Sequence, residues 1–231
     1  MQSEIRPGSF KVLPLVIKNL IIINSLVWLA QITIGQDLIT MENLFALHHF
    51  SSTHYGFWQF ITYMFLHSSS SFFHILFNMF ALWMFGSTLE NLWGPGRFLL
   101  FYLICGVGAG LAQALALTYD ISQYNALFLA GQLSEEELFM LKNVPTLGAS
   151  GAIMGIFAAF AFTFPNSRML ILPIPFPIKA KWALLGLAVL DIIGGISSES
   201  TGIAHFAHLG GAAIGIIVVM IWNKKDRNRF Y

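Results

Sequence analysis

The chain is organised around the octapeptide GASGAIMG, residues 148–155, which begins an apolar run that ends at Pro165. The octapeptide holds a single hydroxyl group, that of Ser150, among small residues. Gly151 and Gly155 form a GxxxG pair, a spacing that lets two membrane helices approach each other closely. A serine in an apolar helix ordinarily donates to the carbonyl group one turn earlier. Taken alone, the stretch predicts close helix packing, and a chemical role for Ser150 depends on what lies beside it.

The composition indicates an integral membrane protein. Of the 231 residues, 56% are hydrophobic and 10% are charged, whereas soluble domains carry about 25% charged residues. So few charges cannot cover a globular surface, so we expect most of the exterior to face the lipid bilayer. The net charge of +1 argues against a nucleic-acid partner. The single cysteine, Cys105, excludes an intrachain disulfide framework, and residues 1–4 show no signal-peptide pattern.

Six apolar runs are long enough to be spanning helices, which need about 20 residues each. The runs do not alternate with period two, so they predict helices rather than barrel strands. The predicted spans are residues 15–35, 72–93, 97–119, 147–165, 180–197 and 203–223. The expected fold class is therefore all-α, a polytopic six-helix bundle, with residues 1–231 forming a single membrane domain.

Basic residues predict the orientation of these spans. With six spans both termini lie on one side, and all of the 12 Lys and Arg residues except Lys142 fall on that side. An excess of positive charge marks the cytosolic side, so we expect cytosolic termini. The basic residues on this side are Arg6, Lys11, Lys18, Arg97, Arg168, Lys179, Lys181, Lys224, Lys225, Arg227 and Arg229. Trp93, Trp182 and Trp222 then lie at cytosolic helix ends, as interfacial anchors do.

Two long loops lie on the outer side. The first, residues 36–71, contains no Lys or Arg, is half apolar and ends in four serines. We expect part of it to lie in the membrane interface, with the serines forming a polar vestibule. The second, residues 120–146, contains Ser134 followed by three glutamates. This pattern predicts a capping box that opens a short helix.

Three polar stretches share one depth in the predicted bundle. The second, fourth and sixth spans all begin at the outer face. His74 and Asn78 lie near that end of the second span, Ser150 of the fourth, and His205 and His208 of the sixth. At about 1.5 Å rise per residue, they lie roughly within one or two turns of each other in depth. Ionisable groups inside a membrane are costly and tend to be functional.

Glycines provide a way to bring two of these stretches into contact. Gly211 and Gly215 form a second GxxxG pair, and His208 lies one turn before it. If the two glycine faces pack together, His208 comes within hydrogen-bond reach of Ser150. A serine hydroxyl is a weak nucleophile until a base takes its proton. We therefore predict Ser150 as nucleophile and His208 as base. The predicted packing residues are Gly148, Gly151, Gly155, Gly211 and Gly215.

The second span supplies candidate donors for a developing oxyanion. His74 and Asn78 are four residues apart and share one helix face. Together with the backbone N–H of Ser150 they can stabilise negative charge on a substrate carbonyl oxygen. The pattern predicts acyl transfer to serine followed by hydrolysis.

Other polar residues leave alternatives open. Asp191 is more in keeping with a structural hydrogen bond, or a pair with a neighbouring helix, than with a third catalytic member. His205 is expected to support packing or to orient His208. Glu90, near the cytosolic end, is expected to be structural. A different hypothesis is a small transporter whose polar relay consists of His74, Asp191, His205 and His208. The sequence contains no inverted repeat or Pro-broken helix pair to favour it.

Three ordered motifs carry a resemblance to a known family. They are HILFN at residues 74–78, GASG at 148–151 and AHLGG at 207–211, accompanied by Gly86, Glu90, WG at 93–94 and RF at 97–98. Over about residues 55–215 the chain resembles the rhomboid family of intramembrane serine proteases. The resemblance implies a six-helix core of the bacterial type, a Ser150–His208 dyad without a catalytic acid, and an oxyanion site with His74 and Asn78.

The resemblance also implies partners and a location. The expected substrates are proteins with a transmembrane segment, cleaved in or near the bacterial cell (inner) membrane. No cofactor or metal is implied, and the HExxH pattern of membrane zinc proteases is missing. Two positions depart from the family pattern: Gln59 follows Trp58 where the family usually has arginine, and Met154 stands where some members stack an aromatic ring on the histidine. An alternative is a non-catalytic rhomboid-like protein that binds membrane clients, but such proteins typically lose the serine or the histidine.

Overall fold

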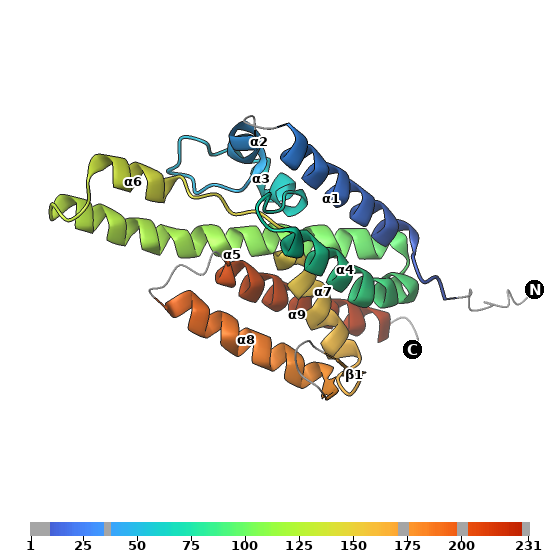
Figure 1. The fold of residues 1–231 in the computed structure, drawn as a ribbon. Coiled ribbons are helices and arrows are strands. Elements are labelled where there is room, and N and C mark those ends of the chain that lie inside the picture. Colours follow the sequence, from blue (N-terminus) through green and yellow to red (C-terminus); the bar gives the residue numbers. More distant parts are fainter. Residues whose placement is uncertain (1–9, 35–37, 171–175, 198–202, 228–231) are drawn as a thin grey trace, which may run out of the picture.

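The computed structural model describes residues 10–34, 38–170, 176–197 and 203–227. Long helices run side by side through the molecule, and short elements connect them at both ends (Figure 1). The elements are α1 (Leu15–Thr33), α2 (Leu38–Phe45), α3 (Gln59–Thr62), η2 (Tyr63–Phe65), α4 (Phe72–Trp93), α5 (Pro95–Leu129), α6 (Glu135–Lys142), α7 (Ser150–Thr163), β1 (Arg168–Met169), β2 (Ile178–Lys179), α8 (Ala180–Ile196) and α9 (His205–Arg227). Residues 1–4, Arg6 and Arg229, used above, lie outside the described residues.

The fold confirms the expected all-α, polytopic membrane bundle. The helices α1, α4, α5, α7, α8 and α9 lie within or overlap the six predicted spans. Among the residues that the structure describes, four helices, α1, α4, α5 and α9, are long and apolar enough to cross a membrane, and α7 is a shorter apolar helix. Between α7 and α8 the chain forms a small antiparallel pair of strands, β1 and β2. The first turn of α1 and the last described turn of α9 lie at the same end of the bundle (Figure 1).

One predicted boundary is wrong. The third span was expected to end at residue 119, but α5 continues to Leu129. Hydropathy falls after residue 119 because Asp120 and Gln123 interrupt the apolar run, yet neither residue stops a helix. The helix therefore extends beyond its apolar part, and α6 follows it after a short turn. The capping box that opens α6 is confirmed, because Ser134 and Glu137 each accept a hydrogen bond from the backbone N–H of the other.

The central helix of the bundle is α7, which packs against α4, α5, α8 and α9. Its buried residues include Ala152, Ala158 and Ala159 together with Gly151 and Gly155. Small side chains leave room for neighbouring backbones to approach, and this explains how four helices can surround so short a segment. Ser150 is the first residue of this helix.

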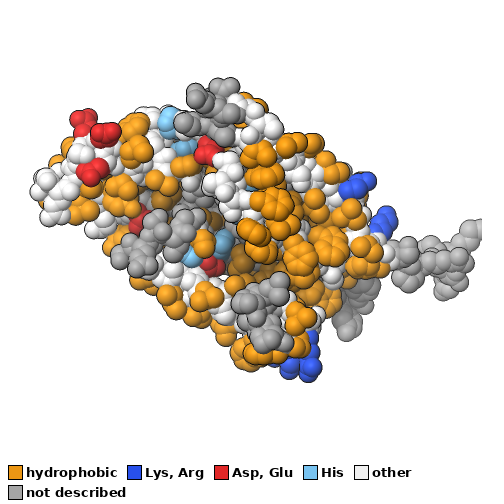
Figure 2. Space-filling model, in the orientation of Figure 1, with side chains coloured by type: hydrophobic (Ala, Val, Ile, Leu, Met, Phe, Trp, Pro, Cys, Tyr) orange, Lys and Arg blue, Asp and Glu red, His pale blue; other side chains and the backbone are white. Residues whose placement is uncertain are grey.

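The outer surface of the bundle is largely apolar. Exposed large side chains include Leu26 of α1, Phe77 and Phe80 of α4, and Leu190 and Ile193 of α8. On the face drawn in Figure 2, hydrophobic side chains cover most of the right-hand half. On this face Lys and Arg lie at the right-hand and lower edges, and acidic side chains gather at the left-hand end, with others nearer the middle. An apolar exterior between charged ends suits a helical bundle surrounded by lipid.

Glu90 has the structural role expected of it. The residue is 3% exposed. Its carboxylate accepts hydrogen bonds from the backbone N–H groups of Val16 and Ile17, each 2.9 Å long. The first N–H groups of a helix lack partners within the helix, so Glu90 of α4 caps α1. This contact fixes the start of α1 against α4 at the end far from Ser150.

Candidate active site

Ser150 is positioned by the segment that precedes it. Thr146 forms an antiparallel bridge with Leu47 of the first outer loop, and the N–H of Gly148 donates to the carbonyl of Tyr63 over 2.9 Å. Gly148 has φ +123°, a conformation that residues with a Cβ rarely adopt. The outer loop thus holds the segment in a turn that leads directly into α7. As the first residue of that helix, Ser150 carries a backbone N–H without an acceptor one turn earlier.

The two GxxxG pairs meet where α7 and α9 cross. A Cβ at Gly211 would collide with the carbonyl oxygen of Gly151, and a Cβ at Gly215 would collide with that of Gly155. The two backbones are therefore closer than any side chain would allow. This approach sets the separation of Ser150 from His208, which precedes Gly211 on α9.

His208 and Ser150 lie within hydrogen-bond distance. The Nε2 atom of His208 is 2.8 Å from the Oγ atom of Ser150. With Nε2 unprotonated, the serine hydroxyl donates to it, and this arrangement lets a neutral imidazole accept the serine proton. The structure brings together the residues that the sequence predicts as nucleophile and base.

The two predicted oxyanion donors, His74 and Asn78, differ in how they lie relative to Ser150. The Nδ1 atom of His74 accepts a hydrogen bond from the N–H of Ser68 at 3.1 Å. This leaves Nε2 as the protonated nitrogen of a neutral ring. A Cβ at Gly148 would lie 3.0 Å from that Nε2 and 3.8 Å from the Oγ of Ser150, so His74 flanks the turn before the serine. The amide of Asn78, in contrast, donates to the carbonyl of His74 over 2.7 Å.

A second histidine supports His74 from the outer loop. The ring of His67 packs edge-on against that of His74, with centroids 5.2 Å apart. Burial and the nearby His74 lower the pKa of His67 to about 4, so this ring is neutral near pH 7. It fills space beside His74 without adding charge to the site.

An acidic residue that sequence reasoning left without a clear role also meets this site. Asp191 of α8 is within hydrogen-bond distance of two histidines of α9. Its Oδ1 lies 2.8 Å from the Nδ1 of His205 and 3.1 Å from the Nδ1 of His208. The pairing with a neighbouring helix was an expectation for Asp191, but the contact with His208 had no spacing pattern to reveal it.

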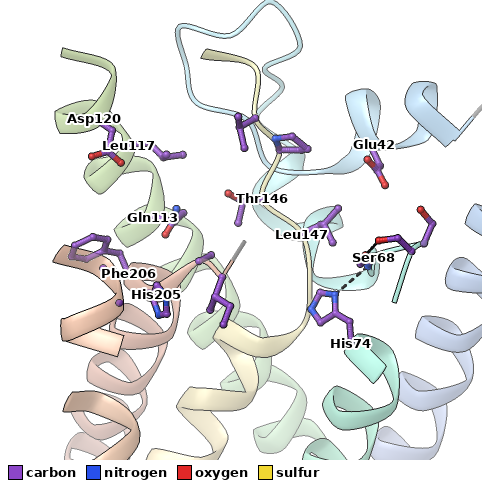
Figure 3. A pocket seen from close by; sticks show the side chains of 18 residues that line it. Glu42, Ser68, His74, Gln113, Leu117, Asp120, Thr146, Leu147, His205 and Phe206 are labelled. Carbon is purple, nitrogen blue, oxygen red and sulfur yellow. Dashed lines mark hydrogen bonds between the residues drawn. The ribbon is translucent and has the colours of Figure 1, made fainter. Parts of the chain in front are cut away.

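A pocket of about 560 Å³ lies beside these residues. His74 and His205 lie on opposite walls with Thr146 and Leu147 between them (Figure 3). Residues 68–70 of the serine-rich segment line the same pocket, at the place of the expected polar vestibule. Ser150 and His208 do not line it themselves, but His74, which flanks Ser150, and His205, which shares Asp191 with His208, both do.

Gln59 stands where the family usually has arginine, and it organises the first outer loop. The side chain is fully buried. Its Oε1 accepts from the N–H of His48 over 3.1 Å, and its Nε2 donates to the carbonyl of His54 over 2.7 Å and to those of Asn43 and Leu44. A neutral amide therefore links both arms of the loop whose Leu47 and Tyr63 hold the segment before Ser150.

Comparisons with known proteins agree with this architecture. The family model of the rhomboid domain matches residues 54–225. The chain is 30% identical to rhomboid protease AarA of Providencia stuartii over 207 residues, which cover 87% of this chain and 69% of that protein. The chain belongs to the rhomboid family.

Mitochondrial proteins are also similar. The chain is 32% identical to the mitochondrial presenilin-associated rhomboid-like protein of Homo sapiens over 69% of its own length. It is 29% identical to the mitochondrial rhomboid protein 1 of Saccharomyces cerevisiae over 65%. The match covers 38% of each of these two relatives.

Proposed function

We propose that this protein is an intramembrane serine endopeptidase that cleaves membrane proteins at or near a transmembrane segment. The observation that carries the proposal is the 2.8 Å contact between His208 Nε2 and Ser150 Oγ at the start of α7. A base at this distance can remove the serine proton as the oxygen attacks a carbonyl carbon. The similarity to a protein named rhomboid protease supports the same activity here.

The proposed reaction has two steps. In the first, Ser150 Oγ attacks the scissile carbonyl, its proton passes to His208 Nε2, and the same proton then goes to the leaving amine. In the second, water attacks the acyl-serine ester while His208 takes the water proton and returns it to Ser150. Both steps pass through a tetrahedral oxyanion. The backbone N–H of Ser150 at the positive end of α7, with His74 beside it, is the proposed donor set.

A role for Asn78 in the oxyanion site requires a different side-chain conformation from the one in the structure. Its amide donates to the carbonyl of His74, so a role in the oxyanion site requires its side chain to turn when substrate binds. His74 already lies beside the turn at Gly148. We therefore assign the first contact with the oxyanion to His74 and the backbone of Ser150.

The proposed setting is a cell membrane with both termini in the cytosol. The positive charge at the end of the bundle that holds the start of α1 and the last described turn of α9 supports this orientation. The greater coverage by the bacterial relative supports the bacterial cell (inner) membrane over an organelle. In this orientation the pocket beside Ser150 opens to the outer side and supplies the hydrolytic water.

Cleavage in lipid vesicles tests the function. Purified protein is reconstituted with a reporter that has one transmembrane helix between two detectable soluble tags. We expect the wild type to separate the tags, and Ser150→Ala and His208→Ala each to reduce separation to the uncatalysed level. Cleavage that persists in both variants would exclude the assignment. A wild type that binds the reporter without cutting it would favour the client-binding alternative.

A further inference from the structure

We propose that Asp191 is a positioning residue that holds His208 in the tautomer able to accept a proton from Ser150. The assignment rests on the proposed function and extends the serine–histidine pair expected from the resemblance by a third member. The three groups come from three helices: Ser150 from α7, His208 from α9 and Asp191 from α8. Their hydrogen bonds, 2.8 Å and 3.1 Å long, use the two different nitrogens of the His208 ring.

The tautomer follows from the chemistry of the carboxylate. An ionised carboxylate only accepts hydrogen bonds, so the Nδ1 atom of His208 that faces Asp191 must carry the proton. Nε2 of a neutral imidazole is then unprotonated and accepts the hydroxyl of Ser150. When Nε2 takes the serine proton, the ring becomes positive, and the adjacent carboxylate stabilises that charge. Without Asp191, the neutral ring could carry its proton on Nε2, and a protonated Nε2 cannot accept the proton of Ser150.

His205 keeps Asp191 in place. Its Nδ1 donates to the same oxygen, Oδ1, over 2.8 Å. A Cβ at Gly194 would collide with the His205 ring. Gly194 lies three residues after Asp191, so the carboxylate and the gap that admits the ring are on one face of α8. The side chains of Asp191, His205 and His208 are 10%, 12% and 17% exposed, so little water competes for these bonds.

The competing explanation is that Asp191 only fastens α8 to α9. In that case asparagine, which is the same size and keeps one accepting oxygen, serves as well. If Asp191 sets the tautomer, the amide NH₂ of Asp191→Asn can donate a hydrogen bond to an unprotonated Nδ1 of His208. This favours the tautomer that carries its proton on Nε2. We expect kcat to fall by at least about 10²-fold with KM unchanged. Asp191→Glu, which restores a carboxylate, should recover part of the loss.

The kinetic test uses the whole chain in vesicles with the transmembrane reporter, and Glu135→Gln, which also turns a carboxylate into an amide, is the control. Glu135 of α6 is exposed and does not line the pocket, so its variant should cleave like the wild type. The thermal midpoint of Asp191→Asn is measured alongside. A folded Asp191→Asn protein with wild-type kcat would overturn the proposal while leaving the proteolytic function intact.

A second measurement does not depend on activity. Nitrogen NMR of protein labelled with ¹⁵N-histidine distinguishes Nδ1–H from Nε2–H rings, and comparison with His208→Gln identifies the His208 signals. We expect Nδ1–H in the wild type and in Asp191→Glu, and Nε2–H or a mixture in Asp191→Asn. A His208 signal of the Nε2–H form in the wild type, or unchanged in Asp191→Asn, would overturn the proposal even if the protein cleaves no substrate. If the asparagine variant does not fold, the wild-type and glutamate spectra decide.

Discussion

At the residue scale, the candidate site depends on Ser150 of α7, His208 of α9 and Asp191 of α8. The first two were predicted to meet because each lies beside a GxxxG pair, and the pairs indicate which helix faces pack. Asp191 stands alone in an apolar helix, and no spacing shows which way it points. Its direction depends on the rotation of α8 against α9, which is set by the fit of His205 against Gly194. Only three-dimensional packing reveals that contact.

Gln59 is a second residue whose role the sequence did not reveal. Four hydrogen bonds end on its buried amide. Gln59→Ala removes these four bonds from the loop that holds Thr146 and Gly148, and only the carbonyl of Leu44 keeps another donor, Trp58 Nε1. We expect a loss of about 2–4 kcal/mol in the free energy of unfolding, measured by denaturation in detergent, and slower cleavage. Gln132→Ala, at an exposed glutamine, is the control. Equal stability of the two variants would contradict this role for Gln59.

At the scale of elements, the crossing of α7 and α9 carries the site. The positions of the long helices could be predicted from hydropathy, because lipid requires long apolar segments whose backbone bonds are satisfied internally. The end of α5 could not, since a helix can continue into a polar environment after its apolar run stops. The turn before Ser150 could not either, because it depends on a bridge to the distant Leu47.

Adding one methyl group to α9 tests whether the close approach of α7 and α9 positions the site. In Gly211→Ala the new Cβ collides with the carbonyl of Gly151, so the helices must separate and His208 moves from Ser150. We expect a loss of roughly 1–3 kcal/mol in stability and a larger proportional loss of cleavage. Gly186→Ala is the matched control, because a Cβ there meets nothing within 4 Å, and it should retain wild-type stability and activity. If Gly211→Ala behaves like Gly186→Ala, close approach of α7 and α9 is not what positions the pair.

At the scale of the whole molecule, the distribution of charge supports the proposed orientation, in which the end rich in Lys and Arg faces the cytosol. The C-terminal part of α9, which contains Lys224, and α6, which contains Glu136, lie towards opposite ends of the bundle (Figure 1), and both residues are exposed. The native Cys105 is buried, so a maleimide that cannot cross membranes should leave it unmodified. In intact cells we expect the reagent to label Glu136→Cys, and to label Lys224→Cys only after the membrane is opened. The reverse pattern would contradict the orientation.

In the proposed mechanism, Ser150 forms a covalent intermediate when His208 activates it. The most direct measurement is the mass of tryptic peptides after the protein in vesicles reacts with a fluorophosphonate, which modifies activated serines. We expect one adduct, on the peptide that contains Ser150, and its loss in His208→Ala as well as in Ser150→Ala. Reporter cleavage by a protein that carries no adduct on Ser150, or undiminished labelling of Ser150 in His208→Ala, would contradict it.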